Sequence, residues 1–219
     1  MKFPDRGLSS WHAALYRLYD SLTRNDPVRP VDLIFVLAGR MERKPYGLAL
    51  YRAGLAPRLL LSVGRFEVGR MRAVDFEKTA ELIAERDRAA PSDRHFFCEI
   101  TGGGTRIERV HLRSWNTYGE LLGFREFLAR DPPRSVMVIS TDVHLRRVAA
   151  VIRRVFRDPP PGVCYCPVPA AASSVRRTEW WTRRGDRNLV LSEAVKLAAY
   201  RAILTMPEWL IRRLMRLKS

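Results

Sequence analysis

Asp32-Leu33-Ile34-Phe35-Val36-Leu37-Ala38-Gly39 is the stretch that decides the fold, together with Leu59-Leu60-Leu61-Ser62-Val63-Gly64 further along the chain. Each is a short, continuous apolar run, which is typical of a strand buried on both faces of a sheet. Between them, Pro45 suits the first turn of a helix and Gly54 suits its end. The whole stretch is therefore predicted to be a strand–helix–strand unit with a right-handed crossover, so the two strands should run parallel.

The alternation of strand and helix continues along the chain, and it predicts an α/β fold with a mainly parallel sheet of five strands and helices on both faces. The expected strands lie at 32–38, 59–63, 95–100, 135–140 and 163–168. The expected helices outside the first unit lie at 11–22, 75–88, 116–130, 143–156, 189–204 and 208–217. We expect the first of these helices to be a lid-like outer element.

The chain has 219 residues, a length at which one α/β domain can close a full hydrophobic core. We expect a single domain over 1–219, with its core at about 30–170 and a helical extension at about 176–219. No stretch has the character of a signal peptide or of the roughly 20 apolar residues of a membrane span. A cytoplasmic location is therefore expected.

Cysteine usage argues against disulfides and against a metal site. Cys98, Cys164 and Cys166 are an odd number in a chain of this size, which is atypical of a disulfide framework. No CxxC pair or paired histidine accompanies them, so we expect reduced core thiols and no bound metal.

The formal net charge is +16 at pH 7, and such a surface attracts phosphates, nucleic acid or acidic lipid. Only five of the 39 basic residues are lysines, and this skew toward arginine is also typical of a high-GC genome. The charge therefore has a functional and a compositional explanation, and the sequence leaves both open.

Ligands of open parallel sheets bind beyond the carboxyl ends of the strands, where loops and helix N-termini meet. The candidate ligand-binding residues at those positions are Gly39, Arg40, Arg43, Gly64, Arg65, Ser114, Asn116, Thr117, Thr141 and Arg146. Arginine forks and hydroxyl groups suit phosphate or carboxylate oxygens, so we expect a small anionic ligand. His144, with Asp142 two residues before it, is the candidate catalytic group, because histidine exchanges protons near neutral pH.

Each of these residues also has a purely structural interpretation. Ser114-x-x-Thr117 and Thr117-x-x-Glu120 are capping patterns, and Asp142 suits the start of a helix in the same way. The loop arginines are equally consistent with solvated surface charges, and His144 with a helix-surface residue. The functional interpretation rests on all of them meeting at one edge of the sheet.

Taken together, these segments resemble the SanA/ElyC/YdcF-like family, a bacterial group associated with the cell envelope. The run 32–39 resembles its opening strand and glycine turn, and Arg43 to Gly54 resembles its arginine, helix and LYxxG stretch. Ser114-Trp115-Asn116-Thr117 with Glu120 resembles its S/R-x-N-T-x-E segment, and residues 140–147 resemble its T-S-x-x-H-x-x-R-A segment. The resemblance spans roughly 32–169 and extends weakly to Glu193, Lys196 and Tyr200.

The resemblance implies a three-layer Rossmann-like fold, a role in cell-envelope biogenesis or lipid-carrier metabolism, and, for a soluble member, binding of S-adenosylmethionine. It implies no established reaction. This chain departs from the family where Arg40 and Arg65 follow single glycines in place of the usual glycine pairs. Those arginines stand in the loops expected to hold the ligand, so its identity can differ from that of the relatives.

Two other classes of function compete with binding of a small anion, with or without turnover. Arginine pairs at 176–177, 183–184 and 212–213, interleaved with tryptophans, suit a binder of nucleic acid or of an anionic membrane. No nucleic-acid-binding motif accompanies them, whereas the basic tail at 206–219 suits a peripheral membrane helix. A nucleophilic hydrolase and an ordinary ATPase are disfavoured, because G-x-S-x-G and G-x-x-x-x-G-K-[ST] are both absent. The oligomeric state stays open.

Overall fold

The computed structural model describes residues 10–112, 114, 116–156, 162–173 and 175–216. Its centre is a six-stranded sheet with the strand order β4-β3-β2-β1-β5-β6. The strands are β1 Leu33–Val36, β2 Arg58–Val63, β3 Phe96–Thr101, β4 Gly104–Arg109, β5 Ser135–Ser140 and β6 Gly162–Pro167. The helices are α1 Ser10–Leu22, α2 Arg43–Arg52, α3 Thr79–Arg88, α4 Thr117–Leu128, α5 Asp142–Val155, α6 Arg184–Ile203 and α7 Glu208–Arg216, with 3-10 turns η1 Val68–Ala73 and η2 Pro91–Asp93.

The prediction of a mainly parallel, five-stranded sheet is wrong in two respects. β1, β2, β5 and β6 are parallel, but β3 runs antiparallel to β2, and β4 is a sixth strand antiparallel to β3. The turn that starts at Gly102 joins β3 to β4, and Gly104 has a φ of +120° that favours glycine. β4 lies at the edge of the sheet and is at most half-buried, so it lacks the apolar run by which the other strands were predicted.

The connection between β2 and β3 reverses the strand direction. Val63 at the end of β2 pairs with Phe96 at the start of β3, so this connection leaves and re-enters the sheet at the same edge. β3 therefore begins where the parallel strands end. His95, directly before β3, consequently lies at the carboxyl edge of the parallel strands.

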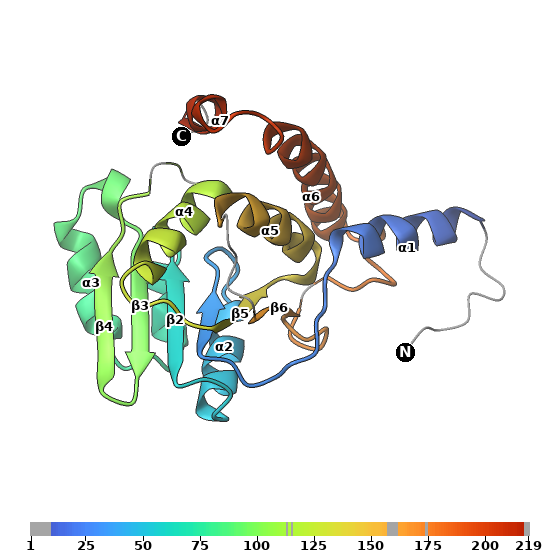
Figure 1. Cartoon of the computed structure of the whole chain (residues 1–219). Helices are drawn as coiled ribbons and strands as arrows, with labels where there is room; N and C mark the ends of the chain where they lie inside the picture. Colours follow the sequence, from blue (N-terminus) through green and yellow to red (C-terminus); the bar gives the residue numbers. More distant parts are fainter. Residues whose placement is uncertain (1–9, 113, 115, 157–161, 174, 217–219) are drawn as a thin grey trace.

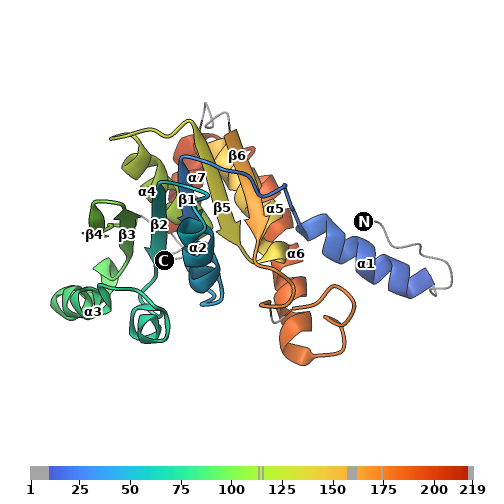
Figure 2. The ribbon, with the colours of Figure 1, turned by 90° about the horizontal axis from the view of Figure 1, so that it is seen from below.

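Helices cover both faces of the sheet, and the alternation of side chains along each strand divides the core in two. Figure 2 shows α2 and α3 on one face and α4 and α5 on the other. On the α4–α5 side, Phe35 stacks on Phe124 with ring centroids 3.8 Å apart. On the other side, Ile34 and Val36 belong to the cluster that includes Leu48 of α2.

The remaining helices pack outside these layers. Tyr19 and Leu22 of α1 form a third cluster with Val143 of α5 and with Val190 and Leu197 of α6. α1 therefore packs against α5 and α6 at one end of the molecule, whereas α6 and α7 arch above α4 and α5 (Figure 1). No helix in the described residues is both long enough and apolar enough to cross a membrane.

Gly47 is where α2 approaches β1 most closely. A Cβ atom there would lie 2.4 Å from Cγ2 of Val36, a fully buried and rotationally stiff side chain. We predict that Gly47→Ala lowers the free energy of unfolding by about 1–3 kcal/mol, measured by urea denaturation. The matched control is Gly185→Ala in α6, where an added Cβ meets nothing within 4 Å and stability should not fall. Equal stability of the two variants would contradict this account of the contact.

Candidate functional site

A cavity of about 630 Å³ lies at the carboxyl edge of the parallel strands. Its walls come from the loops after β1 and β2, from the segment before β3, and from α4, α5 and α6. The lining residues are Ala38, Gly39, Gly64, Arg65, Phe66, Glu67, His95, Leu112, Asn116, Thr117, Glu120, His144, Arg147, Lys196, Ala199, Tyr200 and Ile203. Segments distant in the sequence thus meet at one place, as the strand topology requires.

The structure divides the sequence-predicted site residues into three groups. Those on the cavity wall are Gly39, Gly64, Arg65, Asn116, Thr117 and His144. Those one layer behind the wall, in contact with a wall residue, are Arg43, Thr141 and Ser114. Those outside the cavity wall are Arg40, Asp142 and Arg146.

The residues outside the wall have other surroundings. Asp142 accepts a hydrogen bond from the hydroxyl of Tyr19 and one of 2.8 Å from the backbone N–H of Val143. It thus joins α5 to α1, and burial raises its pKa. Arg40 pairs with Glu42 at 3.7 Å on the surface.

Asn116, and not Ser114 or Thr117, caps α4. Its Oδ1 accepts from the backbone N–H groups of Tyr118 and Gly119 at 3.0 and 3.1 Å. The cap satisfies these two N–H groups, so they are not available to a ligand. Ser114 in turn donates to Asn116 Oδ1 at 3.1 Å.

His144 is buried in a ring of donors and acceptors. Its Nδ1 lies 2.8 Å from Ser140 Oγ and 3.4 Å from Arg43 Nη2, and its Nε2 lies 3.2 Å from Thr117 Oγ1. Burial lowers its pKa well below the ordinary value, and the charges of Arg147, Arg43 and Lys196 lower it further. The ring is therefore neutral, and because Arg43 can only donate, its proton lies on Nε2 and faces Thr117.

A buried ion pair places a cation beside this histidine. Arg147 of α5 donates to both carboxylate oxygens of Glu193 in α6, with contacts of 2.9 to 3.1 Å, and to the hydroxyl of Thr117. Lys196, whose side chain is half-exposed, reaches the same carboxylate at 3.1 Å. The pair fixes α6 against α5 and brings Lys196 and Tyr200 to the cavity.

A second ion pair lies at the β1–β2 side of the cavity. Lys44, fully buried, contacts Glu67 Oε1 at 2.6 Å and donates to the carbonyl of Leu37 at 3.0 Å. Glu67 Oε2 accepts the backbone N–H of Gly64 at 2.8 Å. Burial opposes ionisation of Glu67, but Lys44 and the backbone donors outweigh it and lower the pKa of this carboxyl. Glu67 is therefore an anion whose oxygens are both engaged.

Between the two ion pairs lies a chain of three hydrogen-bonded groups. Glu120 Oε1 accepts from Ala38 N–H at 2.7 Å and from Ser62 Oγ at 2.6 Å. Ser62 Oγ lies 2.9 Å from His95 Nε2. Burial raises the pKa of Glu120 against the opposing effects of its donors and of nearby Lys44 and Arg43, and burial lowers the pKa of His95 to about 4.

Sequence reasoning missed several wall residues for identifiable reasons. Glu120 stood in the quoted N-T-x-E segment but was interpreted as a cap. His95 was assigned to the start of a strand in a mainly parallel sheet, which would have placed it at the opposite edge, whereas β3 runs antiparallel to β2. Glu67 carries no local signal, because it reaches the cavity through the connection that leads into η1. Lys196 was named only at the weak end of the family resemblance, because it reaches the cavity through the packing of α6 on α5.

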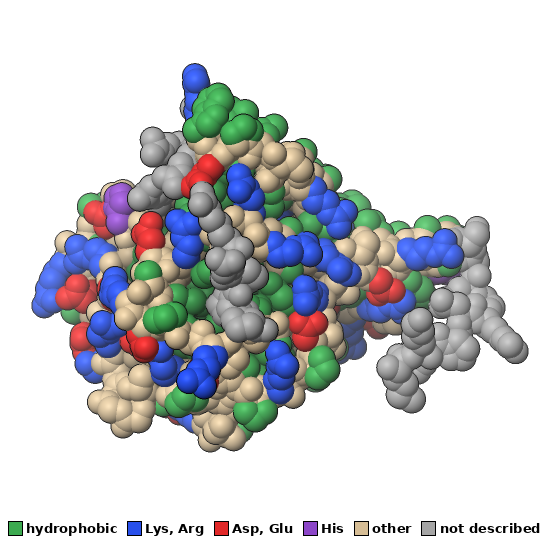
Figure 3. All heavy atoms as spheres, in the orientation of Figure 1, with side chains coloured by type: hydrophobic (Ala, Val, Ile, Leu, Met, Phe, Trp, Pro, Cys, Tyr) green, Lys and Arg blue, Asp and Glu red, His purple; other side chains and the backbone are tan. Residues whose placement is uncertain are grey.

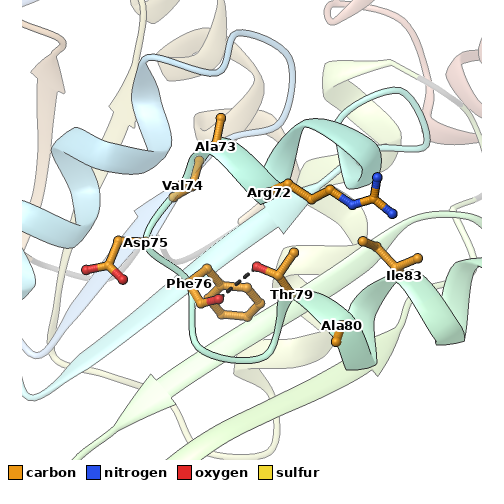
Figure 4. Close-up of a pocket in the computed structure, with 8 residues that line it drawn as sticks. All are labelled: Arg72, Ala73, Val74, Asp75, Phe76, Thr79, Ala80 and Ile83. Carbon is orange, nitrogen blue, oxygen red and sulfur yellow. Dashed lines mark hydrogen bonds between the residues drawn. The ribbon is translucent and has the colours of Figure 1, made fainter.

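A slightly larger hollow of about 690 Å³ lies between η1 and α3 (Figure 4). All of its lining residues come from 72–83, and its Thr79 hydroxyl already donates to the carbonyl of Phe76 at 2.7 Å. It brings no distant segments together, so we assign the candidate site to the cavity at the strand ends. Among the described residues, no group of three or more His, Cys, Asp and Glu side chains could hold a metal ion.

Basic side chains are spread over the molecular surface. Figure 3 shows arginine and lysine scattered over one face among acidic groups, without a single continuous basic patch. On the cavity wall, the cations are Arg65, Arg147 and Lys196. No protein-family model, curated protein or solved structure matches this chain.

The buried neutral histidines predict a loss of stability in acid. The unfolded chain binds a proton at His95 near pH 6.5, whereas the folded protein does so only near pH 4. Stability from this group is complete above pH 6.5 and falls as the pH drops to 4, by at most about 3 kcal/mol. His144 acts in the same direction.

We predict that His95→Gln flattens this pH dependence, measured by urea unfolding at a series of pH values. The control is His111→Gln, because the side chain of His111 is 79% exposed. If His95→Gln loses stability on acidification as steeply as the unaltered protein, burial of a neutral His95 is not the cause.

Proposed function

We propose that the cavity binds a small anionic ligand that carries a phosphate or resembles a nucleotide. The observation that carries this proposal is the convergence of Gly39, Arg65, Thr117 and His144, from four separate segments, on one cavity at the carboxyl edge of the sheet. Such an edge is where open α/β sheets bind their ligands.

The hydrogen bonds around Thr117 favour an anion. Its Oγ1 receives the N–H groups of Arg147 and of His144 Nε2, so its own proton is left to be donated. A hydroxyl polarised by a guanidinium and a ring N–H is a strong donor to a negatively charged oxygen. Lys196, on the same wall, supplies a positive charge.

The other part of the cavity suits a flat or apolar ligand body. Phe66 is 75% exposed on the cavity wall, and the guanidinium of Arg65 lies 4.4 Å from the centre of its ring. Leu112, Ala199 and Ile203 add apolar surface. An exposed aromatic ring beside an arginine is a platform on which a base can stack.

The resemblance to the SanA/ElyC/YdcF-like family suggests a biological role and further candidate ligands. The resemblance implies a Rossmann-like fold, a role in cell-envelope or lipid-carrier metabolism, and S-adenosylmethionine as an alternative ligand. The probes for a binding experiment are therefore inorganic phosphate, a nucleoside diphosphate, a sugar nucleotide, a polyprenyl phosphate and S-adenosylmethionine.

We predict that Thr117→Val and Lys196→Ala each weaken binding of the best of these probes roughly 10- to 100-fold, measured by calorimetry, because each removes a charge-assisted contact of about 1.5–3 kcal/mol. Lys78→Ala is the matched control, since Lys78 pairs with Glu81 three residues away, as Lys196 does with Glu193, but outside the cavity. Unchanged affinity in both cavity variants, or binding of no probe, would contradict the proposal.

Helix α7 carries a second candidate function, peripheral contact of a cytoplasmic protein with an anionic membrane. Ile211 is fully buried, whereas Trp209 is 66% exposed and Arg213 is exposed. Hydrophobic side chains gather over α7 at the top of Figure 3. A tryptophan beside basic residues on one helix suits the interface of an acidic bilayer.

We predict that Trp209→Ala lowers co-sedimentation with phosphatidylglycerol vesicles roughly tenfold, because burial of a large apolar side chain contributes about 1.5–3 kcal/mol. Trp11→Ala is the control, since Trp11 is 54% exposed but lies on α1. Equal losses in the two variants, or binding unaffected by salt, would exclude a specific contact through α7.

A further inference from the structure

The two carboxylates on the cavity wall have opposite environments. Both oxygens of Glu67 are engaged, one by Lys44 and the other by the backbone N–H of Gly64. Glu120 uses only Oε1, which accepts from Ala38 N–H and Ser62 Oγ, and no described residue bonds its Oε2. Glu120 therefore retains one carboxyl oxygen for the cavity that it lines.

The direction of the hydrogen bonds behind Glu120 follows from proton counting. Ser62 has one hydroxyl proton, which it donates to Glu120 Oε1. The 2.9 Å contact between Ser62 Oγ and His95 Nε2 must then be donated by the histidine, so the proton of the neutral ring lies on Nε2. His95 thus donates to Ser62, and Ser62 donates to Oε1 of Glu120. Oε2 is left as the carboxyl oxygen that can gain or lose a proton.

Electrostatics separates the two carboxyls further. Lys44 and the backbone donors lower the pKa of Glu67, whereas burial raises the pKa of Glu120. Two titratable groups in one site whose pKa values are shifted in opposite directions are typical of acid–base catalytic sites. His144, the sequence-based candidate, has both ring nitrogens engaged and lies among cations that oppose its protonation.

We propose that Glu120 is the acid–base group of the cavity, exchanging a proton between its Oε2 and the bound anion, with Ser62 and His95 as positioning residues. The proposal rests on the proposed function for the identity of the proton acceptor. In the step, the Oε2–H bond breaks, the electron pair stays on the carboxylate, and the proton forms a bond to a basic oxygen of the ligand. Ala38 N–H and Ser62 O–H stabilise the carboxylate that remains, and the reverse transfer restores the acid.

Other charged groups surround this carboxyl and affect its titration. They are Arg43 and Lys44 of α2, Arg65 and Glu67 after β2, His95 before β3, His144 and Arg147 of α5, and Lys196 of α6. The cations favour the carboxylate, and burial favours the acid. The experiment must therefore assign the titration to Glu120 itself.

Infrared spectroscopy of the full chain tests the proposal without any ligand. A carboxylic acid shows a carbonyl stretch that disappears on ionisation. In the Asp142→Asn background, which removes another carboxyl whose pKa burial raises, we expect a band that titrates above the ordinary Glu value of about 4.3. Glu120→Gln should remove this band, and Ser62→Ala should move its titration to higher pH by removing a donor to the carboxylate. Glu67→Gln and Glu81→Gln should leave it in place.

The proposal is overturned if no band titrates above the ordinary range, if the band survives in Glu120→Gln, or if it disappears in Glu67→Gln. Ser62→Ala keeps the test valid should Glu120→Gln fail to fold, because an unmoved titration in that variant also contradicts the hydrogen-bond chain.

Calorimetry with inorganic phosphate and a nucleoside diphosphate, in buffers of different ionisation enthalpy, tests the link to the ligand. We expect a buffer-dependent heat in the unaltered protein and its loss in Glu120→Gln, with affinity reduced less than tenfold. A titrating Glu120 band without binding of either probe would count against the proposed function and leave the acid in place. Binding without buffer-dependent heat would overturn proton exchange while leaving the proposed function standing.

Discussion

The hydrogen bonds accepted by the buried carboxyl group of Glu120 hold together the elements at the carboxyl edge of the parallel strands. This carboxyl group joins α4 to the end of β1 through Ala38 N–H and to β2 through Ser62, and Ser62 extends the link to His95 before β3. Buried polar groups left without partners cost more than their hydrogen bonds contribute, so this edge holds together only as a complete network. The polar side chains that pair with backbone groups at the strand ends also line the cavity.

Two buried ion pairs flank this network and act on different parts of the fold. Lys44 and Glu67 fix the loops after β1 and β2, whereas Arg147 and Glu193 fix α6 against α5. Removing one partner of such a pair leaves an uncompensated buried charge, which is far more destabilising than the pair is stabilising. The two pairs thus hold the loops and helices around the cavity in place, while Arg65 and Lys196 add positive charge to its wall.

The candidate site could be predicted from the sequence where a residue follows a strand of the sheet or stands at the start of a helix. Gly39 and Gly64 were placed at the cavity because the carboxyl ends of parallel strands necessarily share an edge, and Asn116, Thr117 and His144 because they stand in the first turns of α4 and α5 or just before them. Asp142 shows the limit of the argument, since it follows β5 but turns toward Tyr19 of α1. Position after a strand fixes where a residue's backbone lies, whereas the direction of its side chain depends on neighbouring elements.

The sequence by itself determined the strands at the centre of the sheet, the helices that cover it and the parallel β1–β2 unit, because apolar runs and helix-breaking residues act locally. Only the tertiary structure decided the direction of β3, the placement of α6 over the cavity and the pairing of charges there. Strand direction depends on the edge at which a long connection returns, and a buried charge is stable only beside a partner. In the pair between Arg147 and Glu193, that partner is 46 residues away. The local pattern of residues predicts neither the direction of a strand nor the pairing of a buried charge. Both depend on how the whole chain provides hydrogen-bond partners for its buried polar groups.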